Sequence, residues 1–337
     1  MLVAMSGGVD SSVAALLLKN KGYDVQGIFL DFFNGKKAIS EVKKVSAKIR
    51  IPLKIIDASG NLKKIVVKYF LEELKKGDTP NPCVVCNKEI KFKILFEKML
   101  ELKADFVATG HYAQVHEVKS QKSKVKSFGL FEARDKNKDQ SYFLYKLNQK
   151  ELSKIIFPLG EYTKTEVRKI AKKFKLSVFD KKESQDICFI PENGHETFLK
   201  KNLKLDQGKI IDYRGDILGK HRGLPFYTIG QRKGIKIGGA GPYYVIRKNF
   251  KQNALIVGSE KELFSKKMKL KNINWIVDKP KLPFKTFIRT RYRSILVYAT
   301  INKDGVEFEK PQRAITPGQS AVFYSKKGEV IGGGVIV

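Results

Sequence analysis

Two cysteines in the stretch TPNPCVVCN (residues 79–87) are the side chains of this chain best suited to chemistry. Cys83 and Cys86 lie three residues apart, and the sequence has one other cysteine, Cys188. Such a pair can bind a metal ion, act as a redox switch or supply a nucleophile. Structural zinc usually needs four ligands, and redox pairs normally lack prolines like those before Cys83. The pair therefore favours a reacting thiol.

A reacting cysteine needs thiolate character, which its surroundings must provide. Several lysines surround Cys86 in the sequence, and a helix is predicted to begin near Lys88. Cationic side chains and a helix N-terminus both lower the pKa of a nearby thiol. We therefore expect a lowered pKa for Cys86.

A glycine-rich turn near the start of the chain, SGGVDSS (residues 6–12), is a candidate anion site. Its glycines let the backbone come close to a ligand, and its serines supply hydroxyls beside the free N–H groups at a helix start. The turn lacks the lysine of P-loop kinases and GTPases and the GxGxxG of dinucleotide-binding folds. It therefore predicts phosphate binding outside those two classes.

Alternating strands and helices are predicted to position these motifs. We expect strands at 2–5, 25–30, 53–58 and 105–110, and helices at 13–23, 38–50, 61–75 and 88–102. Strands separated by helices of this length predict an α/β fold with a doubly wound parallel sheet, whose ligands bind at the carboxyl ends of the strands. The glycine-rich turn, the cysteine loop and ATGHY (108–112) should therefore share one crevice.

The later part of the chain has a different character. Thr163 and Glu166 have the spacing of a capping box, which predicts a helix start. From about residue 206, short glycine-punctuated strands replace the helices. Arg289, Arg291 and Arg293 alternate along FIRTRYR, so a strand there would place all three on one face.

The charge of the chain indicates a polyanionic partner. Its 337 residues include 66 Lys and Arg against 34 Asp and Glu, which gives a net charge of +32. A nucleic acid is the most economical partner for such an excess. Three cysteines and no apolar run near the roughly 20 residues of a membrane span predict a cytoplasmic, thiol-reduced protein without a membrane segment.

A family resemblance emerges when the motifs are read in order. They are SGGVDSS, GDTPNPCVVCNKEIKF (77–92), ATGHYAQ (108–114), KDQSYFLY (138–145), DICFI (186–190), GQRKGIKIGG (230–239), TRYR (290–293) and TPGQSAVFY (316–324). In this order they resemble the bacterial tRNA-specific 2-thiouridylases of the PP-loop ATP pyrophosphatase class over nearly the whole chain. The resemblance implies a PP-loop adenylation and thiolation domain, then a small mostly-β linking domain, then a C-terminal β-barrel that contacts tRNA. We place these domains at 1–205, 206–266 and 267–337.

The resemblance also implies an activity. It is the ATP-dependent 2-thiolation of the wobble uridine of tRNA, in which the 2-carbonyl oxygen is adenylated and sulfur is then transferred from a cysteine persulfide. The expected cofactors are ATP and Mg²⁺. The expected partners are tRNA and a persulfide donor protein, either a cysteine desulfurase or a sulfur carrier, and we expect a monomer.

Site residues follow from the same resemblance, position by position. The catalytic cysteines match Cys86, as nucleophile, and Cys188, as persulfide carrier. The ATP-binding positions match Ala4, Met5, Ser6, Gly7, Gly8, Val9, Asp10, Ser11, Leu30 and Gly110. The tRNA-binding positions match Asn81, Pro82, Cys83, His111, Lys138, Asp139, Gln140, Arg291, Tyr292 and Gln319.

Cys83 departs from the commonest pattern of this family, and alternatives stay open there. Many members have Asp at this position, where the carboxylate is assigned to handle protons around the target base. With a thiol instead, Cys83, Cys86 and Cys188 become candidate ligands of a [4Fe-4S] cluster with one open iron. We prefer the persulfide relay to this cluster.

Two other functions remain as alternatives. A PP-loop ligase for a small molecule would have no use for the basic barrel or for Cys86 and Cys188. A non-catalytic RNA-binding or redox-sensing protein would have no need of an intact SGGVDSS turn.

Overall fold

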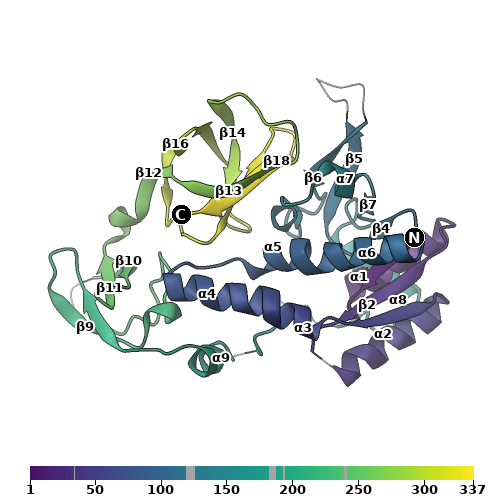
Figure 1. Ribbon diagram of the computed structural model, residues 1–337, viewed down its shortest axis with the longest axis horizontal. Coiled ribbons are helices and arrows are strands. Elements are labelled where there is room, and N and C mark those ends of the chain that lie inside the picture. Colours follow the sequence, from purple (N-terminus) through teal and green to yellow (C-terminus); the bar gives the residue numbers. More distant parts are fainter. Residues whose placement is uncertain (34, 119–125, 182–186, 193, 239–240) are drawn as a thin grey trace.

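A parallel five-stranded sheet organises the N-terminal part of the molecule (Figure 1). The computed structural model describes residues 1–33, 35–118, 126–181, 187–192, 194–238 and 241–337. The strand order is β3-β2-β1-β4-β7, and every neighbouring pair is parallel. The strands are β1 (Leu2–Met5), β2 (Gln26–Asp31), β3 (Leu53–Asp57), β4 (Val107–Ala108) and β7 (Ile155–Ile156). The predicted doubly wound α/β sheet is therefore confirmed.

Helices cover both faces of this sheet because successive strand residues point to opposite sides. On one face Val3 and Met5 pack against α1 (Val9–Asn20), α2 (Lys36–Ile49) and α8 (Lys164–Lys173). On the other face Leu2 packs with two long helices. The first comprises α3 (Ser59–Asn61), the π-helical segment η1 (Leu62–Val67) and α4 (Lys68–Lys76), and the second comprises α5 (Pro82–Cys86), η2 (Asn87–Phe92) and α6 (Lys93–Glu101).

The start of the cysteine helix differs from the prediction. It begins at Pro82 and not near Lys88, because proline is well tolerated in the first turn, where its missing N–H is not needed. Cys83 therefore lies in the first turn, and Cys86 lies just before the π-helical segment. The preceding helix, α4, ends at Lys76 and has Gly77 as its C-cap, whose φ of +97° is a left-handed conformation that favours glycine.

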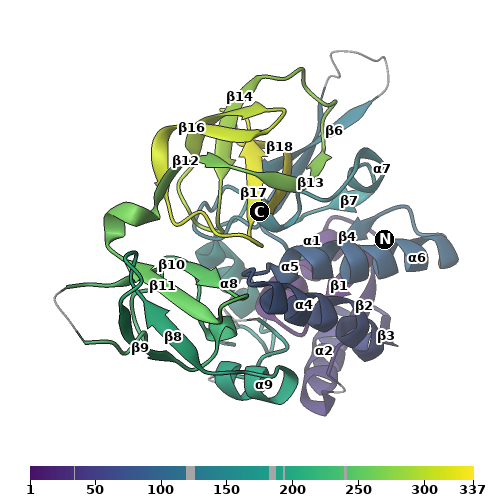
Figure 2. The ribbon, with the colours of Figure 1, turned by 60° about the vertical axis from the view of Figure 1, so that its left-hand side comes forward.

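A small four-stranded sheet forms the middle of the chain. Its order is β10-β11-β8-β9, with α9 (His195–Asn202) packed beside it. The strands are β8 (Gly208–Ile211), β9 (Ile217–His221), β10 (Tyr244–Asn249) and β11 (Ala254–Gly258), and short 3₁₀ turns occupy η4 (Leu224–Phe226) and η5 (Glu260–Leu263). Figure 2 shows this sheet below the C-terminal barrel and beside the parallel sheet.

The C-terminal barrel is built from antiparallel strands and also recruits a hairpin from the first half of the chain. Its own strands are β12 (Phe264–Met268), β13 (Leu270–Trp275), β14 (Phe284–Arg289), β15 (Val297–Asn302), β16 (Gly305–Arg313), β17 (Ser320–Tyr324) and β18 (Glu329–Ile336). The hairpin of β5 (Ala113–Val118) and β6 (Ser127–Glu132) joins this sheet where β6 pairs with β18. The first and last parts of the chain therefore share one sheet.

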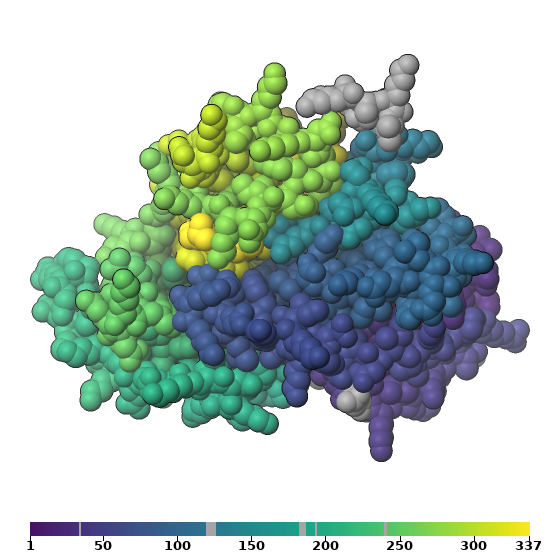
Figure 3. Space-filling model, viewed as in Figure 1, coloured from purple at the N-terminus to yellow at the C-terminus, as the bar shows by residue number. Residues whose placement is uncertain are grey.

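Further contacts seat the barrel on the cysteine loop. The Thr79 N–H donates to the Pro317 carbonyl (2.8 Å), and the Gln319 side-chain amide donates to the Thr79 carbonyl (2.7 Å). Figure 3 shows the yellow C-terminal residues lying directly against the dark blue helical region. The remaining short elements are η3 (Ser141–Phe143) and α7 (Gln149–Leu152). None of the helices in the described ranges is long and apolar enough to cross a membrane.

Candidate active site

The glycine-rich turn connects the carboxyl end of β1 to the start of α1. Gly7 has a φ of +68°, which a side chain would strain, and Gly8 is the N-cap of α1. The Ser11 hydroxyl accepts from the Ser6 N–H (3.0 Å), and the Ser12 hydroxyl donates to the Gly8 carbonyl (2.8 Å). Because no side chain caps α1, its first N–H groups are left for an anion.

Gly110, just after β4, is in direct contact with this turn. A side chain on Gly110 would place its Cβ 2.7 Å from the Ser11 nitrogen, which only glycine avoids. β1 and β4 are neighbours at the point where the strand order reverses, and α/β sheets bind ligands at such points. Leu30 is buried near the carboxyl end of β2, on the other side of β1. The predicted proximity of SGGVDSS and ATGHY is therefore confirmed.

Asp10 in the turn is held by two side chains from distant elements. The Tyr112 hydroxyl donates to Asp10 Oδ1 (2.8 Å), and Lys164 Nζ contacts both carboxylate oxygens (2.7 and 2.8 Å). The predicted capping box of Thr163 and Glu166 is present and starts α8 at Lys164.

Sequence reasoning missed Lys164, although a signal for it existed. A lysine in the first turn of a helix faces the positive end of the helix dipole, so it needs a compensating anion. Asp10 is that anion in the structure.

The three cysteines are free thiols, and the charge of one lysine acts on all three. Cys86 is buried, whereas Cys83 and Cys188 are exposed. Desolvation by the surrounding protein raises the pKa of each thiol, and that of Cys86 to about 11, while the charge of Lys91 acts in the opposite direction on all three. The expected lowering of the Cys86 pKa is wrong, because burial outweighs the nearby cation.

Lys91, and not Lys88, is the cation of this group. Lys88 Nζ pairs with Glu151 at 2.7 Å, so its charge is already neutralised. Lys91 lies five residues after Cys86 along the π-helical segment, whose i to i+5 hydrogen bonds stack such positions more closely than an α-helix does. Within the described residues, Cys83, Cys86 and Cys188 do not form a group of three placed to bind a metal ion.

His111 lies beside the cysteine helix but is not a proton carrier at neutral pH. Its ring packs against Phe92 and Phe157, both with centroids 6.1 Å away, and its Nδ1 lies 2.7 Å from the Thr109 hydroxyl. Burial, and secondarily the charge of Lys91, lowers the pKa of His111 to about 3. The imidazole is therefore neutral and serves packing and hydrogen bonding.

Several residues implied as tRNA contacts lie at junctions between distant segments. Asn81 and Pro82 are buried at the start of the cysteine helix. Tyr292 packs on Phe143, with ring centroids 4.5 Å apart, and so joins the TRYR and KDQSYFLY motifs. Lys138 is half-buried in the loop before η3. Asp186 and Gly239, in the DICFI and GQRKGIKIGG motifs, lie outside the described residues.

The prediction that Arg289, Arg291 and Arg293 lie on one face of a strand is wrong. β14 ends at Arg289, so Arg291 and Arg293 lie in the following turn and the three side chains do not share a strand face. Arg289 pairs with Glu132 and Asp139 of the same chain.

The other two arginines differ in their surroundings. The Arg291 guanidinium donates to the carbonyls of Ile229 (3.2 Å) and Ala314 (2.9 Å). Arg293 is exposed, with its guanidinium 5.2 Å from the centroid of the Tyr292 ring.

The chain matches three family models in succession, described as a tRNA methyl transferase HUP domain (1–192), a tRNA methyl transferase PRC-barrel domain (196–259) and an aminomethyltransferase beta-barrel domain (265–336). A 4-thiouridine synthetase in complex with RNA and ATP is similar at 16% identity, covers 59% of this chain and 48% of its own, and has a TM-score of only 0.37.

Curated relatives match from end to end. A tRNA-specific 2-thiouridylase of Clostridium botulinum (strain Langeland) is 43% identical and covers 99% of this chain and 97% of its own. A tRNA-specific 2-thiouridylase of Halothermothrix orenii is 45% identical and covers 100% of this chain and 98% of its own. At this identity and coverage, the chain belongs to the tRNA-specific 2-thiouridylase family.

Proposed function

We propose that this protein is a tRNA-uridine 2-sulfurtransferase, which converts ATP to AMP and pyrophosphate and replaces the 2-oxygen of the wobble uridine with sulfur. One observation carries the proposal beyond family membership. Cys86 and Cys188 are far apart in sequence, yet both thiols interact with the charge of Lys91. A buried nucleophile, a second thiol and a shared cation are what a sulfur relay requires.

The first step takes place at the SGGVDSS turn. The ten ATP-binding candidates are the last two residues of β1, the turn, the start of α1, Leu30 and Gly110. The phosphates would therefore lie over the N–H groups of α1. The uridine 2-oxygen attacks the α-phosphorus, the bond to the bridging oxygen breaks, and pyrophosphate leaves. Lys164 fixes the Asp10 carboxylate beside the place where the leaving group would lie.

Mg²⁺ is compatible with this site. Mg²⁺ prefers oxygen ligands, and it commonly binds through one or two carboxylates together with substrate phosphates. Asp10 and the Ser6 and Ser11 hydroxyls are oxygens of this kind at the turn. When bound there, the ion would neutralise charge on the leaving pyrophosphate.

The second step transfers sulfur. A persulfide on Cys188 attacks C2 of the adenylated base through its terminal sulfur, and AMP leaves. The Cys86 thiolate then attacks Cys188 Sγ, which breaks the persulfide bond, leaves the terminal sulfur on C2 and joins Cys86 to Cys188 as a disulfide. An external thiol reductant restores the two cysteines for the next turnover.

Because the pKa of the Cys86 thiol is raised in the free protein, tRNA binding would have to promote its deprotonation. In the free protein burial keeps the Cys86 thiol protonated at neutral pH, so it is a poor nucleophile before tRNA arrives. Lys91 is the group that stabilises the anion once the proton leaves. Cys83 lies in the first turn of the same helix and is exposed, near where the base would enter.

A [4Fe-4S] cluster is the main alternative sulfur source. The arrangement of Cys83, Cys86 and Cys188 does not fit three ligands of one metal group, so no step is routed through a cluster. A small-molecule ligase would need neither Cys188 nor the barrel contacts on the cysteine loop. The proposed partners are tRNA and a protein that delivers persulfide sulfur to Cys188. The boundaries at 206 and 267 and the monomeric state belong to the same proposal.

The test combines adenylation with cysteine variants. Wild-type protein should catalyse exchange of pyrophosphate into ATP only when tRNA is present. Cys86→Ser and Cys188→Ser should keep this exchange but lose thiolation of tRNA, while Cys83→Ser should keep partial thiolation. Exchange without tRNA would indicate a small-molecule ligase. Equal loss of thiolation in all three variants, with stoichiometric iron in anaerobically purified protein, would replace the relay by the cluster.

A further inference from the structure

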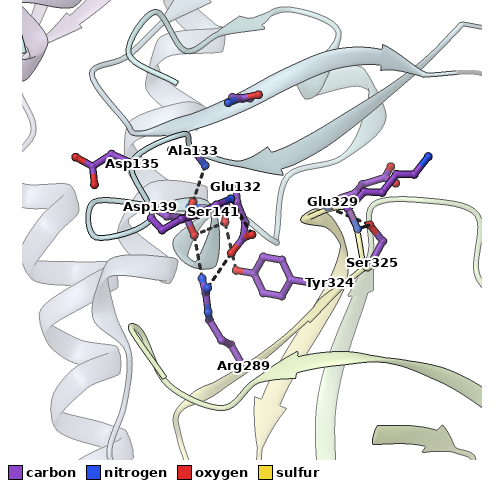
Figure 4. A network of polar contacts seen from close by, with 12 residues as sticks. Glu132, Ala133, Asp135, Asp139, Ser141, Arg289, Tyr324, Ser325 and Glu329 are labelled. Carbon is purple, nitrogen blue, oxygen red and sulfur yellow. Dashed lines mark hydrogen bonds and ion pairs between the residues drawn. The ribbon is translucent and has the colours of Figure 1, made fainter. Parts of the chain in front are cut away.

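Arg289 links the C-terminal barrel to the segment that follows β6. Its side chain is 13% exposed and pairs with Glu132 (Nη2 to Oε1, 2.8 Å) and Asp139 (Nη1 to Oδ2, 2.9 Å). The two carboxylate side chains are 7% and 1% exposed. Figure 4 shows Arg289 pointing away from the barrel strands toward both acids, beside the ring of Tyr324. One barrel side chain therefore pairs with two buried acids that come from the first half of the chain. Lys136 also pairs with Glu132, at 3.0 Å.

The loop that contains these acids is closed by hydrogen bonds to Asp139. Its carboxylate accepts from the N–H groups of Ala133 (3.0 Å) and Ser141 (3.2 Å) and from the Ser141 hydroxyl (3.0 Å). The Ser141 hydroxyl also contacts the Tyr324 hydroxyl of β17 at 3.2 Å. A buried carboxylate needs compensating donors, so the shape of residues 132–141 depends on the Arg289 guanidinium.

The same loop supports both side chains that hold Asp10. The Gln140 N–H donates to the Tyr112 carbonyl (2.7 Å), and the Tyr112 N–H donates to Gln140 Oε1 (3.0 Å). Asp135 accepts from the Lys164 N–H at the start of α8 (2.9 Å). Tyr112 and Lys164 then reach the Asp10 carboxylate through their side chains.

We propose that Arg289 is a positioning residue for ATP activation, which acts through residues 132–141, Tyr112 and Lys164 on the carboxylate of Asp10. The inference rests on the proposed function, because it takes Asp10 as part of the ATP-binding turn. It makes the geometry of that turn depend on how the barrel is seated, and the barrel is the part proposed to contact tRNA. A purely structural Arg289 would affect stability and leave the KM for ATP unchanged.

Two variants test the link, and neither of them simply removes the positive charge and leaves the two buried acids unpaired. Arg289→Lys keeps the charge but loses the planar fork that spans two carboxylates. The triple variant Arg289→Met, Glu132→Gln, Asp139→Asn removes all three charges together, so no buried charge remains unpaired. Arg313→Lys is the matched control, because Arg313 is also a barrel arginine in an ion pair, with Glu260 at 2.8 Å.

The measurements are tRNA-dependent AMP release, the affinity for a fluorescent ATP analogue and the affinity for tRNA. Both Arg289 variants should raise the KM for ATP and the analogue Kd about fivefold and lower kcat about tenfold, because small misplacements of catalytic groups are costly. The tRNA affinity of Arg289→Lys, and all three measurements for the Arg313→Lys control, should stay within about twofold of wild type.

Wild-type values of KM, kcat and analogue affinity in a folded Arg289 variant would overturn the inference. Absence of tRNA-dependent AMP release from the wild type would instead refute the proposed function. In that case the analogue affinity alone still decides whether Arg289 acts on the turn, because the hydrogen-bonded link exists without tRNA.

Discussion

Cys86 illustrates how one ionisation controls the proposed reaction. Burial raises the pKa of this thiol to about 11, so the thiolate fraction increases with pH throughout the neutral range. In a Cys83→Ser, Cys188→Ser background, alkylation of Cys86 by iodoacetamide should speed up about tenfold per pH unit and level off only near the raised pKa. A plateau at or below the ordinary thiol pKa would show that Cys86 is not buried in solution as the structure has it.

Lys91 should set the position of that plateau. Its charge lowers the pKa of Cys86, so Lys91→Met should move the profile to still higher pH and slow alkylation at any fixed pH below it. Lys88→Met is the control, because Lys88 already pairs with Glu151. A larger shift of the profile in the Lys88 variant than in the Lys91 variant would show that Lys88, and not Lys91, is the cation that lowers the pKa of Cys86.

At the scale of elements, the start of α8 connects helix capping to the ATP site. Thr163 caps α8, and the next residue is Lys164, which holds Asp10. Thr163→Ala should lower the free energy of unfolding by about 1 kcal/mol and also raise the KM for ATP, because fraying of the first turn releases Lys164.

A second capping box provides a matched comparison. Asn148 caps α7 in the same way but has no contact with Asp10 among the described residues. Asn148→Ala should therefore cost about as much stability, measured by urea unfolding, with little change in the KM for ATP. Equal KM values in the two variants would contradict a role for the α8 start in positioning Lys164.

At the scale of the whole molecule, the two arginines after β14 should differ in their effect on tRNA binding. Arg293→Gln should reduce the log-log salt slope of tRNA binding by about one unit or less without affecting stability, since this guanidinium is exposed. Arg291→Gln should lower the free energy of unfolding by about 2 kcal/mol, because it removes charged hydrogen bonds to the Ile229 and Ala314 carbonyls.

Urea unfolding and tRNA titrations at several salt concentrations would separate these effects. A reduced salt slope in Arg291→Gln, with stability unchanged, would make Arg291 the phosphate contact that the family resemblance implies. An unchanged slope in both variants would show that neither arginine contacts the tRNA backbone.

The sequence by itself determined what depends on neighbouring residues. The period of apolar residues predicted the parallel sheet, SGGVDSS predicted the turn that starts α1, and the spacing of Thr163 and Glu166 predicted the start of α8. The predictions that failed depended on packing. The raised pKa of Cys86 comes from burial, and the lost arginine face comes from a strand that ends at Arg289.

Only the tertiary structure decided which charged groups meet. Lys164 reaches Asp10 across 154 residues of chain, and Arg289 reaches Asp139 across 150. Local spacing cannot specify such pairs, because any of the 66 cationic side chains satisfies the same charge pattern until the fold fixes their positions. The physical reason is that burial and charge pairing depend on distance in space, which the chain sets only once its sheets have closed and the barrel is seated.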